Sequence, residues 1–462
     1  MKRLLIIFGS IICLICGFLL YPEEQHEIIK NSKNSISSSG AMAILYETEA
    51  DSGEYQVSGD DVWGKEGYIF NEELSKCENG SKIYYDSMQN KIFVETNMVD
   101  RCYVYFDKYG YYLNKKILED NPTVLTRTNF DMVFTEENVG TIYTVSGNRT
   151  EDIDGDGNGE SVYYFAGNSL NNWVKFGKNE NDEDLYWRII RINEDGSIRL
   201  LYVGNSVDST TAYVKTSMWS DIVNDAKYIG YMYGDSGEIE DNRLNTNDSI
   251  IKIAVDTWYE DTILSKSDDN NYTYDNYISR TAIYCNDRAS DDDITWELAG
   301  FVRLWDYSGG AQPSFRCGTN KNGSLTPEAD VQDKFTVSDI TGNGNLKYPV
   351  ALMTSDEIAY AGGWNENSLS SPYAYYYLNA NGESVTGTLA WWTMTPRYIY
   401  GSFIISGSGN PGYLGYVYNN RGQYGVRPVL SLKSCVYWSN GDGSSTNPYE
   451  VFIDNTCSGL DN

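Results

Sequence analysis

Leu185-Tyr-Trp-Arg-Ile-Ile-Arg-Ile192 and Ser197-Ile-Arg-Leu-Leu-Tyr-Val203 are two runs rich in β-branched, aromatic and aliphatic residues, joined by Asn193-Glu-Asp-Gly196. An Asp-Gly turn between two such runs is typical of a β-hairpin. The sequence therefore predicts a hairpin inside the main domain of the chain, which we place at residues 151–434.

Two helices are predicted around this hairpin. In the segment from Ser249 to Leu264, apolar residues recur at helical spacing after a capping cluster. The shorter segment from Ser355 to Ala361 begins after Thr354-Ser-Asp-Glu357, which fits a capping box, and ends before a Gly pair. The other predicted elements of the main domain are short strands, so we expect an α+β fold.

A second informative region begins at the paired Trp391 and Trp392, continues through Tyr/Gly/Asn/Ser-rich sequence, and ends in an apolar strand from Gly425 to Leu432. Neighbouring strand residues face opposite ways, so we expect one Trp ring to be buried and the other partly exposed. Tyrosine offers a large, stiff contact area with a polar tip. The sequence predicts ligand contacts from Trp392, Tyr398, Tyr400, Tyr413, Tyr416, Tyr418, Asn419, Asn420, Arg421 and Tyr424. The alternative is a Tyr-rich strand surface without a ligand.

The N-terminus predicts a membrane anchor at residues 1–21. Basic Lys2 and Arg3 precede an uncharged run from Leu4 to Tyr21, and a bilayer needs about 20 residues. A cleaved signal peptide is the alternative, which would give a secreted protein, but no small-x-small cleavage site follows Leu20. An uncleaved anchor would keep the basic end in the cytoplasm and place the rest outside the cell.

Further domain boundaries follow from composition and strand pattern. Residues 22–40 are rich in Asn and Ser and predict a flexible stalk. Residues 41–108 predict a small all-β module, which includes a hairpin from Lys82 to Thr96. We interpret residues 109–150 as a connector with some strand, and residues 435–462 as a closing strand and tail.

Net charge and histidine content exclude several classes of function. The formal charge of −30 repels nucleic acid and anionic lipid headgroups, so we expect neither as a partner. The only histidine is His26, which leaves no His for a catalytic triad or a His-ligated metal in a folded domain. Carboxylates remain as candidate catalysts, but none stands out, and Asp356-Glu357 is better explained by helix capping. We therefore expect no enzyme activity.

Six cysteines lie outside the anchor, and sequence alone allows several pairings of them. Their grouping as near neighbours in three regions suggests the pairs Cys77–Cys102, Cys285–Cys317 and Cys435–Cys457. An even number of cysteines in an exported chain is typical of disulfides.

An acidic loop at the start of the main domain resembles a calcium loop. Oxygen-bearing side chains recur at every second residue, and Gly157 lies where such a loop bends sharply. The expected ligands of a structural Ca²⁺ are Asp152, Asp154, Asp156, Asn158 and Glu160. Position twelve of the loop is Tyr163 in place of Glu, and a solvated acidic turn is the alternative.

Several motifs occur in an order that resembles a known family. They are Trp187-Arg-Ile-Ile-Arg-Ile192, Tyr348-Pro-Val-Ala-Leu-Met-Thr-Ser-Asp-Glu357, Trp391-Trp-Thr-Met-Thr-Pro396 and Gly425-Val-Arg-Pro-Val-Leu430. Together they resemble a group of surface proteins from gut-dwelling Firmicutes. At the level of fold, the pattern is also similar to C-type-lectin-like domains and formylglycine-generating enzymes. Calcium-lectin sugar motifs and the reactive Cys pair of those enzymes are absent from the chain, so neither activity is implied.

These observations together predict an α+β protein with an N-terminal membrane anchor, a small all-β module, and a C-type-lectin-like domain of short antiparallel strands with two helices. Its predicted role is recognition of a surface glycan or protein outside a bacterial cell. The alternatives are a structural component of the cell envelope and a carboxylate-based carbohydrate-active enzyme.

Overall fold

The structure is a computed structural model. It describes residues 41–48, 53–57, 68–86, 91–95, 99–108, 111–130, 134, 136–221, 228, 230–235, 241, 244–286, 288–290, 296–298, 303–304, 312–318, 334–337, 344–363, 374–398, 401–405, 414–418, 420, 422–453 and 455–459. The chain divides into two compact units, Met1–Tyr111 and Tyr112–Asn462.

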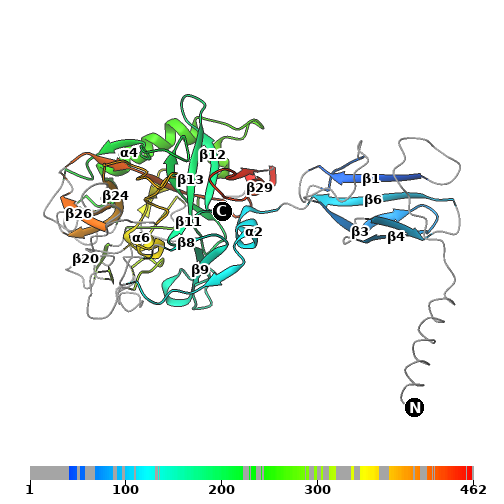
Figure 1. Cartoon of the computed structure of the whole chain (residues 1–462), viewed down its shortest axis with the longest axis horizontal. Helices are drawn as coiled ribbons and strands as arrows, with labels where there is room; N and C mark the ends of the chain where they lie inside the picture. Colours follow the sequence, from blue (N-terminus) through cyan, green and yellow to red (C-terminus); the bar gives the residue numbers. More distant parts are fainter. Residues whose placement is uncertain are drawn as a thin grey trace, which may run out of the picture. The chain divides into compact units, whose positions relative to one another are not determined.

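The smaller unit is built from strands (Figure 1). A four-stranded sheet has the order β2-β1-β6-β3, in which β1 and β6 are parallel and the outer strands are antiparallel to their neighbours. A separate hairpin, β4 with β5, confirms the hairpin predicted from Lys82 onward. The bounds are β1 (Ala41–Glu47), β2 (Tyr55–Val57), β3 (Tyr68–Cys77), β4 (Lys82–Asp86), β5 (Lys91–Glu95) and β6 (Arg101–Lys108).

Alternation along β6 supplies the core of this unit. Cys102, Val104 and Phe106 point inward and are at most 4% exposed, and they pack with Ile92 and Val94 of the hairpin. Successive strand residues face opposite ways, so one face of β6 is buried while the other faces outward.

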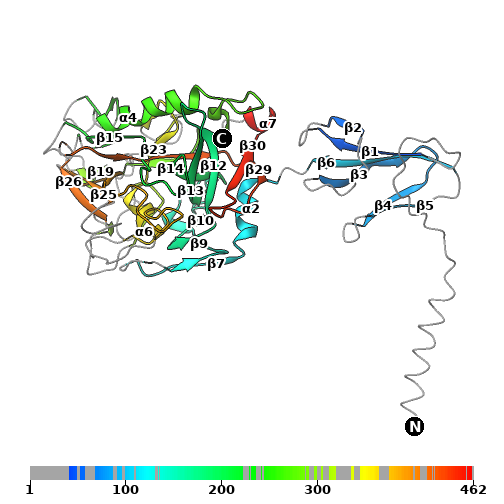
Figure 2. The ribbon, with the colours of Figure 1, turned by 45° about the horizontal axis from the view of Figure 1, so that its top comes forward.

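The larger unit is organised around a ten-stranded sheet. Seven strands follow the order β23-β28-β14-β13-β10-β9-β7, while β12 pairs with β13 and, in parallel, with β30, which pairs with β29. Figures 1 and 2 show β12 and β13 side by side in the middle of this unit. The bounds are β7 (Thr123–Leu125), β9 (Thr141–Val145), β10 (Val162–Tyr164), β12 (Trp173–Lys178), β13 (Asp184–Ile192), β14 (Ile198–Gly204), β23 (Val350–Leu352), β28 (Pro428–Leu432), β29 (Tyr437–Asn440) and β30 (Tyr449–Phe452).

The central hairpin of this sheet is the predicted one. β13 and β14 are antiparallel, and Asn193 N–H donates to the carbonyl of Ser197 at 2.8 Å to close the turn. Gly196 has a φ of 80°, a backbone conformation that only glycine adopts readily. Both strands are buried along nearly their whole length, because neighbouring strands and other elements cover them.

A second, five-stranded sheet has the order β15-β27-β24-β25-β26 and carries the paired tryptophans on β24. Both Trp391 and Trp392 are 0% exposed, so the expectation that one ring is partly exposed is wrong. Trp392 Nε1 donates to the carbonyl of Ser217 at 2.8 Å, and its ring packs against Trp219. The bounds are β15 (Lys215–Ser217), β24 (Trp391–Tyr398), β25 (Gly401–Ile405), β26 (Leu414–Tyr418) and β27 (Tyr424–Val426).

The remaining strands are short pieces. Parallel β11 and β8 form one pair, antiparallel β16 and β17 and β19 and β20 form two more, and β18-β21-β22 form a three-stranded sheet. Their bounds are β8 (Glu137–Asn138), β11 (Asn168–Ser169), β16 (Met232–Tyr233), β17 (Asn247–Asp248), β18 (Tyr284–Cys285), β19 (Arg288–Ser290), β20 (Trp296–Leu298), β21 (Lys334–Thr336) and β22 (Gly344–Asn345).

Both predicted helices of the main domain are present. Ser249 caps the longer one through its side chain, which accepts from Lys252 N–H, and a π-helical turn continues that helix. Thr354 and Glu357 form the predicted capping box of the shorter helix, which ends at the left-handed Gly362. The bounds are α2 (Leu113–Asp120), α4 (Ile250–Tyr259), α6 (Ser355–Ala361) and α7 (Asn455–Ser458), with shorter turns η1 (Gly147–Arg149), η3 (Glu260–Leu264) and η4 (Tyr274–Tyr277).

Buried charge fixes α6 against the central hairpin. The carboxylate of Glu357 lies 2.8 Å from Arg199 Nε and 3.6 Å from Arg191 Nη2, and all three side chains are at most 5% exposed. Its neighbour Asp356 receives two hydrogen bonds from the buried guanidinium of Arg303, at 2.9 and 2.8 Å. The acidic pair that the sequence assigned to capping therefore also neutralises arginines in the core.

The predicted fold class is wrong in its balance of elements. Strands make up 40% of the structure and helices 15%, distributed over several sheets, so the protein is predominantly β and is not the α+β lectin-like arrangement expected. Residues 112–150, expected to be a connector, belong to the larger unit: α2 packs beside β29, and β9 pairs with β10 in the main sheet.

The predicted anchor at 1–21 and stalk at 22–40 lie outside the described residues. Within the described part of the chain, no helix has the length and apolar character needed to cross a membrane.

The three suggested cysteine pairs are confirmed as disulfides: Cys77–Cys102, Cys285–Cys317 and Cys435–Cys457. The first joins β3 to β6 within the smaller unit, and the other two lie within the larger unit. Each disulfide therefore links segments of one unit.

Candidate functional site

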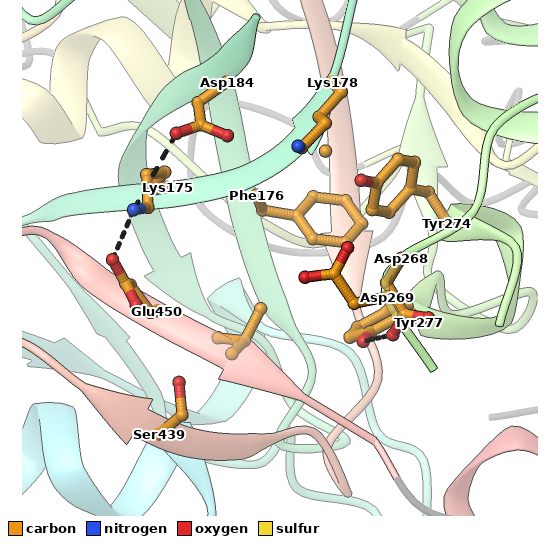
Figure 3. Close-up of a pocket in the computed structure, with 12 residues that line it drawn as sticks. Lys175, Phe176, Lys178, Asp184, Asp268, Asp269, Tyr274, Tyr277, Ser439 and Glu450 are labelled. Atoms are coloured by element: carbon orange, nitrogen blue, oxygen red, sulfur yellow. Dashed lines mark hydrogen bonds and ion pairs between the residues drawn. The ribbon is translucent and has the colours of Figure 1, made fainter. Parts of the chain in front are cut away.

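A pocket of about 170 Å³ opens on the larger unit beside the main sheet (Figure 3). Strand β12 forms one wall, β30 with the end of β29 forms another, and the segment from Asp268 through η4 forms the third. β12 and β30 are held next to each other by parallel pairing, of Val174 with Tyr449 and Lys175 with Glu450. The pocket therefore lies where three segments that are remote in sequence meet.

Aromatic rings close the floor of this pocket. Phe176 of β12 packs edge-on against Tyr274 at 5.5 Å between ring centroids and also contacts Tyr277 at 5.2 Å. The three side chains are at most 5% exposed. The π-helical η3 packs against both β12 and η4. Short π-helical turns are frequent at functional sites.

Some charged groups of the pocket are already paired within the protein. The ammonium of Lys175 contacts the carboxylate of Glu450 and lies 3.8 Å from that of Asp184. The carboxylate of Asp268 accepts from the Tyr277 hydroxyl at 2.5 Å and from two backbone N–H groups of its own loop at 2.9 Å. These groups hold the walls together and have little capacity left for a ligand.

Four other polar groups have no such partner. The side chains of Lys178, Asp269 and Ser439 and the hydroxyl of Tyr274 line the same pocket, and within the described part of the chain none of them forms a side-chain hydrogen bond or ion pair. Lys178 is half-buried, Tyr274 is buried, and Asp269 and Ser439 are exposed. Figure 3 shows Lys178, Asp269 and Tyr274 directed toward the ring of Phe176. Burial, together with the nearby carboxylates, raises the pKa of Tyr274 to about 12, so its hydroxyl is protonated and can donate. The pocket thus offers one cation, one anion and two hydroxyls.

The acidic loop at 152–160 brings together three of the five predicted calcium ligands. Carboxylate oxygens of Asp152, Asp154 and Asp156 lie within 4.8 Å of one another. Asp152 also accepts from Gly155 N–H at 2.8 Å and Gly157 N–H at 3.0 Å, and Gly157 has a φ of 96°. Hard oxygen ligands on a tight turn are the donor set that Ca²⁺ prefers.

The other two predicted ligands are arranged differently. Glu160 accepts from the N–H groups of Ile153 and Asp154, at 2.9 and 3.0 Å, and so closes the loop from its far end. The side-chain amide of Asn158 donates weakly to Asp156, at 3.4 Å. Neither belongs to the converging carboxylate group.

The predicted Trp/Tyr contact surface is described only in part. Trp392 is buried, and Tyr424 is half-buried with its ring packed edge-on against Trp392 at 5.1 Å, so both support the frame of the sheet. Asn420 is exposed. Tyr398, Tyr416 and Tyr418 belong to β24 and β26, but their side chains, like the whole of Tyr400, Tyr413, Asn419 and Arg421, lie outside the described residues.

Sequence reasoning did not find the pocket. Lys178, Asp269 and Ser439 come from three distant segments, and each looks like an ordinary surface residue in its own surroundings. The one local signal was the cluster Tyr272-Thr-Tyr-Asp-Asn-Tyr277, which is denser in tyrosine than a solvated loop needs.

Comparisons of the chain with protein-family models, with curated proteins and with solved structures found no match. The resemblance to bacterial surface proteins therefore stays a prediction from the ordered motifs. Further conclusions about function rest on the geometry of the chain itself.

Proposed function

We propose that the protein is a membrane-anchored extracellular surface protein that recognises a glycan or protein ligand without converting it chemically. The observation that carries this proposal is the pocket beside β12, with four polar groups that no other residue uses. Lys178 is half-buried and Tyr274 is buried, and polar groups in such positions usually have partners, because leaving them without partners costs free energy. Asp269 and Ser439 are exposed and stay accessible to a ligand. Convergent free groups at one pocket are what a binding site requires.

Other features are compatible with this role. Three disulfides are typical of proteins that work in an oxidising, extracellular compartment. The charge of −30 disfavours binding to polyanions and favours ligands that are neutral, zwitterionic or cationic. The membrane anchor and the location on a bacterial surface are also part of this proposal, and they rest on the sequence alone.

The test of this function is an array of glycans and of cell-surface and host proteins, probed with the full chain in mild detergent. We expect retention of at least one ligand class. If nothing is retained, with or without a calcium chelator, the recognition proposal is wrong and a structural role in the envelope is favoured.

We also propose that the loop at 152–160 binds a structural Ca²⁺ ion through the three converging carboxylates. Three like charges held this close repel one another, and a divalent cation relieves the repulsion. Added calcium should raise the melting temperature, and Asp156→Asn should remove most of that rise. Asp221→Asn, which changes an exposed aspartate elsewhere, should respond to calcium as the unmodified chain does. Equal melting temperatures with calcium and with chelator would contradict the calcium proposal.

A further inference from the structure

The two free charges of the pocket have opposite signs. Lys178, at the end of β12, carries a positive charge, and Asp269, in the loop before η4, carries a negative one. Among the described residues neither forms an ion pair, with the other or with any third group, although the charge of Lys178 adds to that of Lys266 in lowering the pKa of Asp182. By contrast, the neighbouring Lys175 is matched to Glu450 and Asp184 across the same walls. The pocket therefore keeps one separated pair of charges available.

The sign of these charges restricts the ligand. Any group that fills this small pocket lies near both Lys178 and Asp269. A purely cationic group would therefore be repelled by Lys178, and a purely anionic group would be repelled by Asp269. Either would form one favourable contact and one repulsive contact with the half-buried Lys178 and the exposed Asp269. A group with both an ammonium and a carboxylate satisfies both walls at once.

Size and floor geometry restrict it further. At about 170 Å³ the pocket is smaller than the roughly 300–1,000 Å³ of pockets for drug-sized ligands, so it accepts one small chemical group. The rings of Phe176, Tyr274 and Tyr277 pack against one another and are at most 5% exposed. They close the floor of the pocket but present no open aromatic face. A sugar ring needs such a face for stacking, so the floor does not favour a sugar.

We propose that this pocket binds a small zwitterion of the α-amino-acid type, either free or carried at the end of a longer surface molecule. Lys178 binds its carboxylate and Asp269 its ammonium, while the protonated hydroxyl of Tyr274, on the same side of the pocket as Lys178 and Asp269 in Figure 3, is available to donate to the carboxylate. The inference deepens the proposed recognition function and rests on it, because it names the chemical class that the same pocket reads.

Isothermal titration of the full chain in detergent with a matched set of small probes tests this directly. L-alanine and D-alanine carry both charges, N-acetylalanine lacks the ammonium, and alaninamide lacks the carboxylate. We expect at least one alanine enantiomer to bind, and each single-charge analogue to bind about tenfold more weakly or worse, as loss of a charge-assisted hydrogen bond implies. Nε-acetyllysine is a zwitterion with a long side chain. If the natural ligand is a zwitterion carried on a larger molecule, Nε-acetyllysine should bind as well as alanine. If the natural ligand is a free small zwitterion, Nε-acetyllysine should bind more weakly than alanine.

Substitutions of Lys178 and Asp269 test which residue binds which charged group of the ligand. Lys178→Gln should weaken alanine binding about tenfold and make alanine and alaninamide equivalent, whereas Asp269→Asn should make alanine and N-acetylalanine equivalent. Lys215→Gln and Asp221→Asn, exposed residues outside the pocket lining, should leave binding unchanged. Melting curves of all four variants separate loss of binding from loss of folding.

Two results would overturn the zwitterion proposal: alaninamide or N-acetylalanine binding as tightly as alanine, or glucose and N-acetylglucosamine binding while alanine does not. Sugar binding that is lost in Lys178→Gln would still leave the pocket as the recognition site. The zwitterion proposal can therefore fail while the proposed recognition function stands. The recognition function itself fails only if the array retains no ligand of any class.

Discussion

At the scale of single residues, the carboxylate of Glu357 has two structural tasks. One of its oxygens accepts from Thr354 N–H at 2.9 Å in the capping box, and the other lies 2.8 Å from Arg199 Nε. Burial lowers the pKa of the nearby Arg191, which shows that the charged guanidinium is poorly solvated and depends on a counter-charge. Removing the counter-charge would leave positive charge uncompensated in the core.

Glu357→Gln should therefore lower the free energy of unfolding by about 3–5 kcal/mol, as expected when one partner of a buried ion pair is removed. Glutamine keeps the size and can still accept from Thr354, so the variant isolates the charge. Denaturant unfolding measures the change. The matched control is Glu260→Gln, whose pair with Lys347 has side chains 54% and 58% exposed and should leave stability nearly unchanged. Equal effects of the two substitutions would contradict this account.

At the scale of elements, the end of α6 depends on a glycine. Gly362 has a φ of 110°, and a Cβ added there would lie 2.3 Å from the carbonyl oxygen of Phe134. Its N–H closes the last helical turn on the carbonyl of Ala359, and its own carbonyl accepts from Phe134 N–H at 3.0 Å. The residue thus joins the helix end to the segment between β7 and β9 of the main sheet.

Gly362→Ala should destabilise the protein by more than backbone strain alone. Gly382 also has a positive φ, 75°, but a Cβ there would meet nothing within 4 Å. Gly382→Ala should cost about 1 kcal/mol of strain, while Gly362→Ala adds a steric clash and should cost clearly more. The difference between the two midpoints of chemical unfolding measures the clash. Indistinguishable midpoints would mean that the Phe134 segment moves aside freely.

Local signals account for what the sequence predicted at this scale. The capping box at Thr354 and Glu357, the Ser249 cap and the Asp-Gly turn of the central hairpin are each decided by residues close together in the chain. The disulfide pairs followed from the same proximity. In contrast, β15 and β23 have three residues each, which is too few to show the alternation of apolar and polar residues that is typical of a strand. Their partner strands are also distant in the sequence. Missing such strands made the fold look more helical than it is.

The candidate site was beyond prediction for a related reason. Its free groups come from three remote segments, and Lys178, Asp269 and Ser439 line one pocket only because β12 pairs with β30 and η3 directs the chain toward η4. The sequence predicted that Trp392 contributes to a contact surface, but Trp392 is buried: its ring packs against Trp219, and its indole N–H donates to the Ser217 carbonyl.

At the scale of the whole molecule, tyrosine burial predicts how stability depends on pH. Burial raises the pKa of Tyr202, Tyr274 and Tyr284 to about 12, with smaller effects of nearby charges, against about 10 in an unfolded chain. Above pH 10 the unfolded state loses these protons while the folded state retains them. Stability that is fully present below about pH 10 should therefore fall as the pH rises toward 12.

Unfolding followed by circular dichroism between pH 8 and 12, with tyrosinate absorbance measured in parallel, tests this behaviour. We expect the loss of structure to coincide with a cooperative increase in absorbance. Tyr202→Phe should make the decline in stability less steep, and Tyr84→Phe, whose ring is 46% exposed, should not. Gradual tyrosine ionisation around pH 10, with the fold intact, would contradict the prediction.

The central claim is that the pocket beside β12 is where this protein recognises its ligand. The most direct measurement compares array binding by the unmodified chain with that by the double variant Lys178→Gln/Asp269→Asn, after melting curves establish that both are folded. We predict that ligands retained by the unmodified chain are lost by the double variant. Retention of the same ligands at the same strength would contradict the claim and place recognition elsewhere on the molecule.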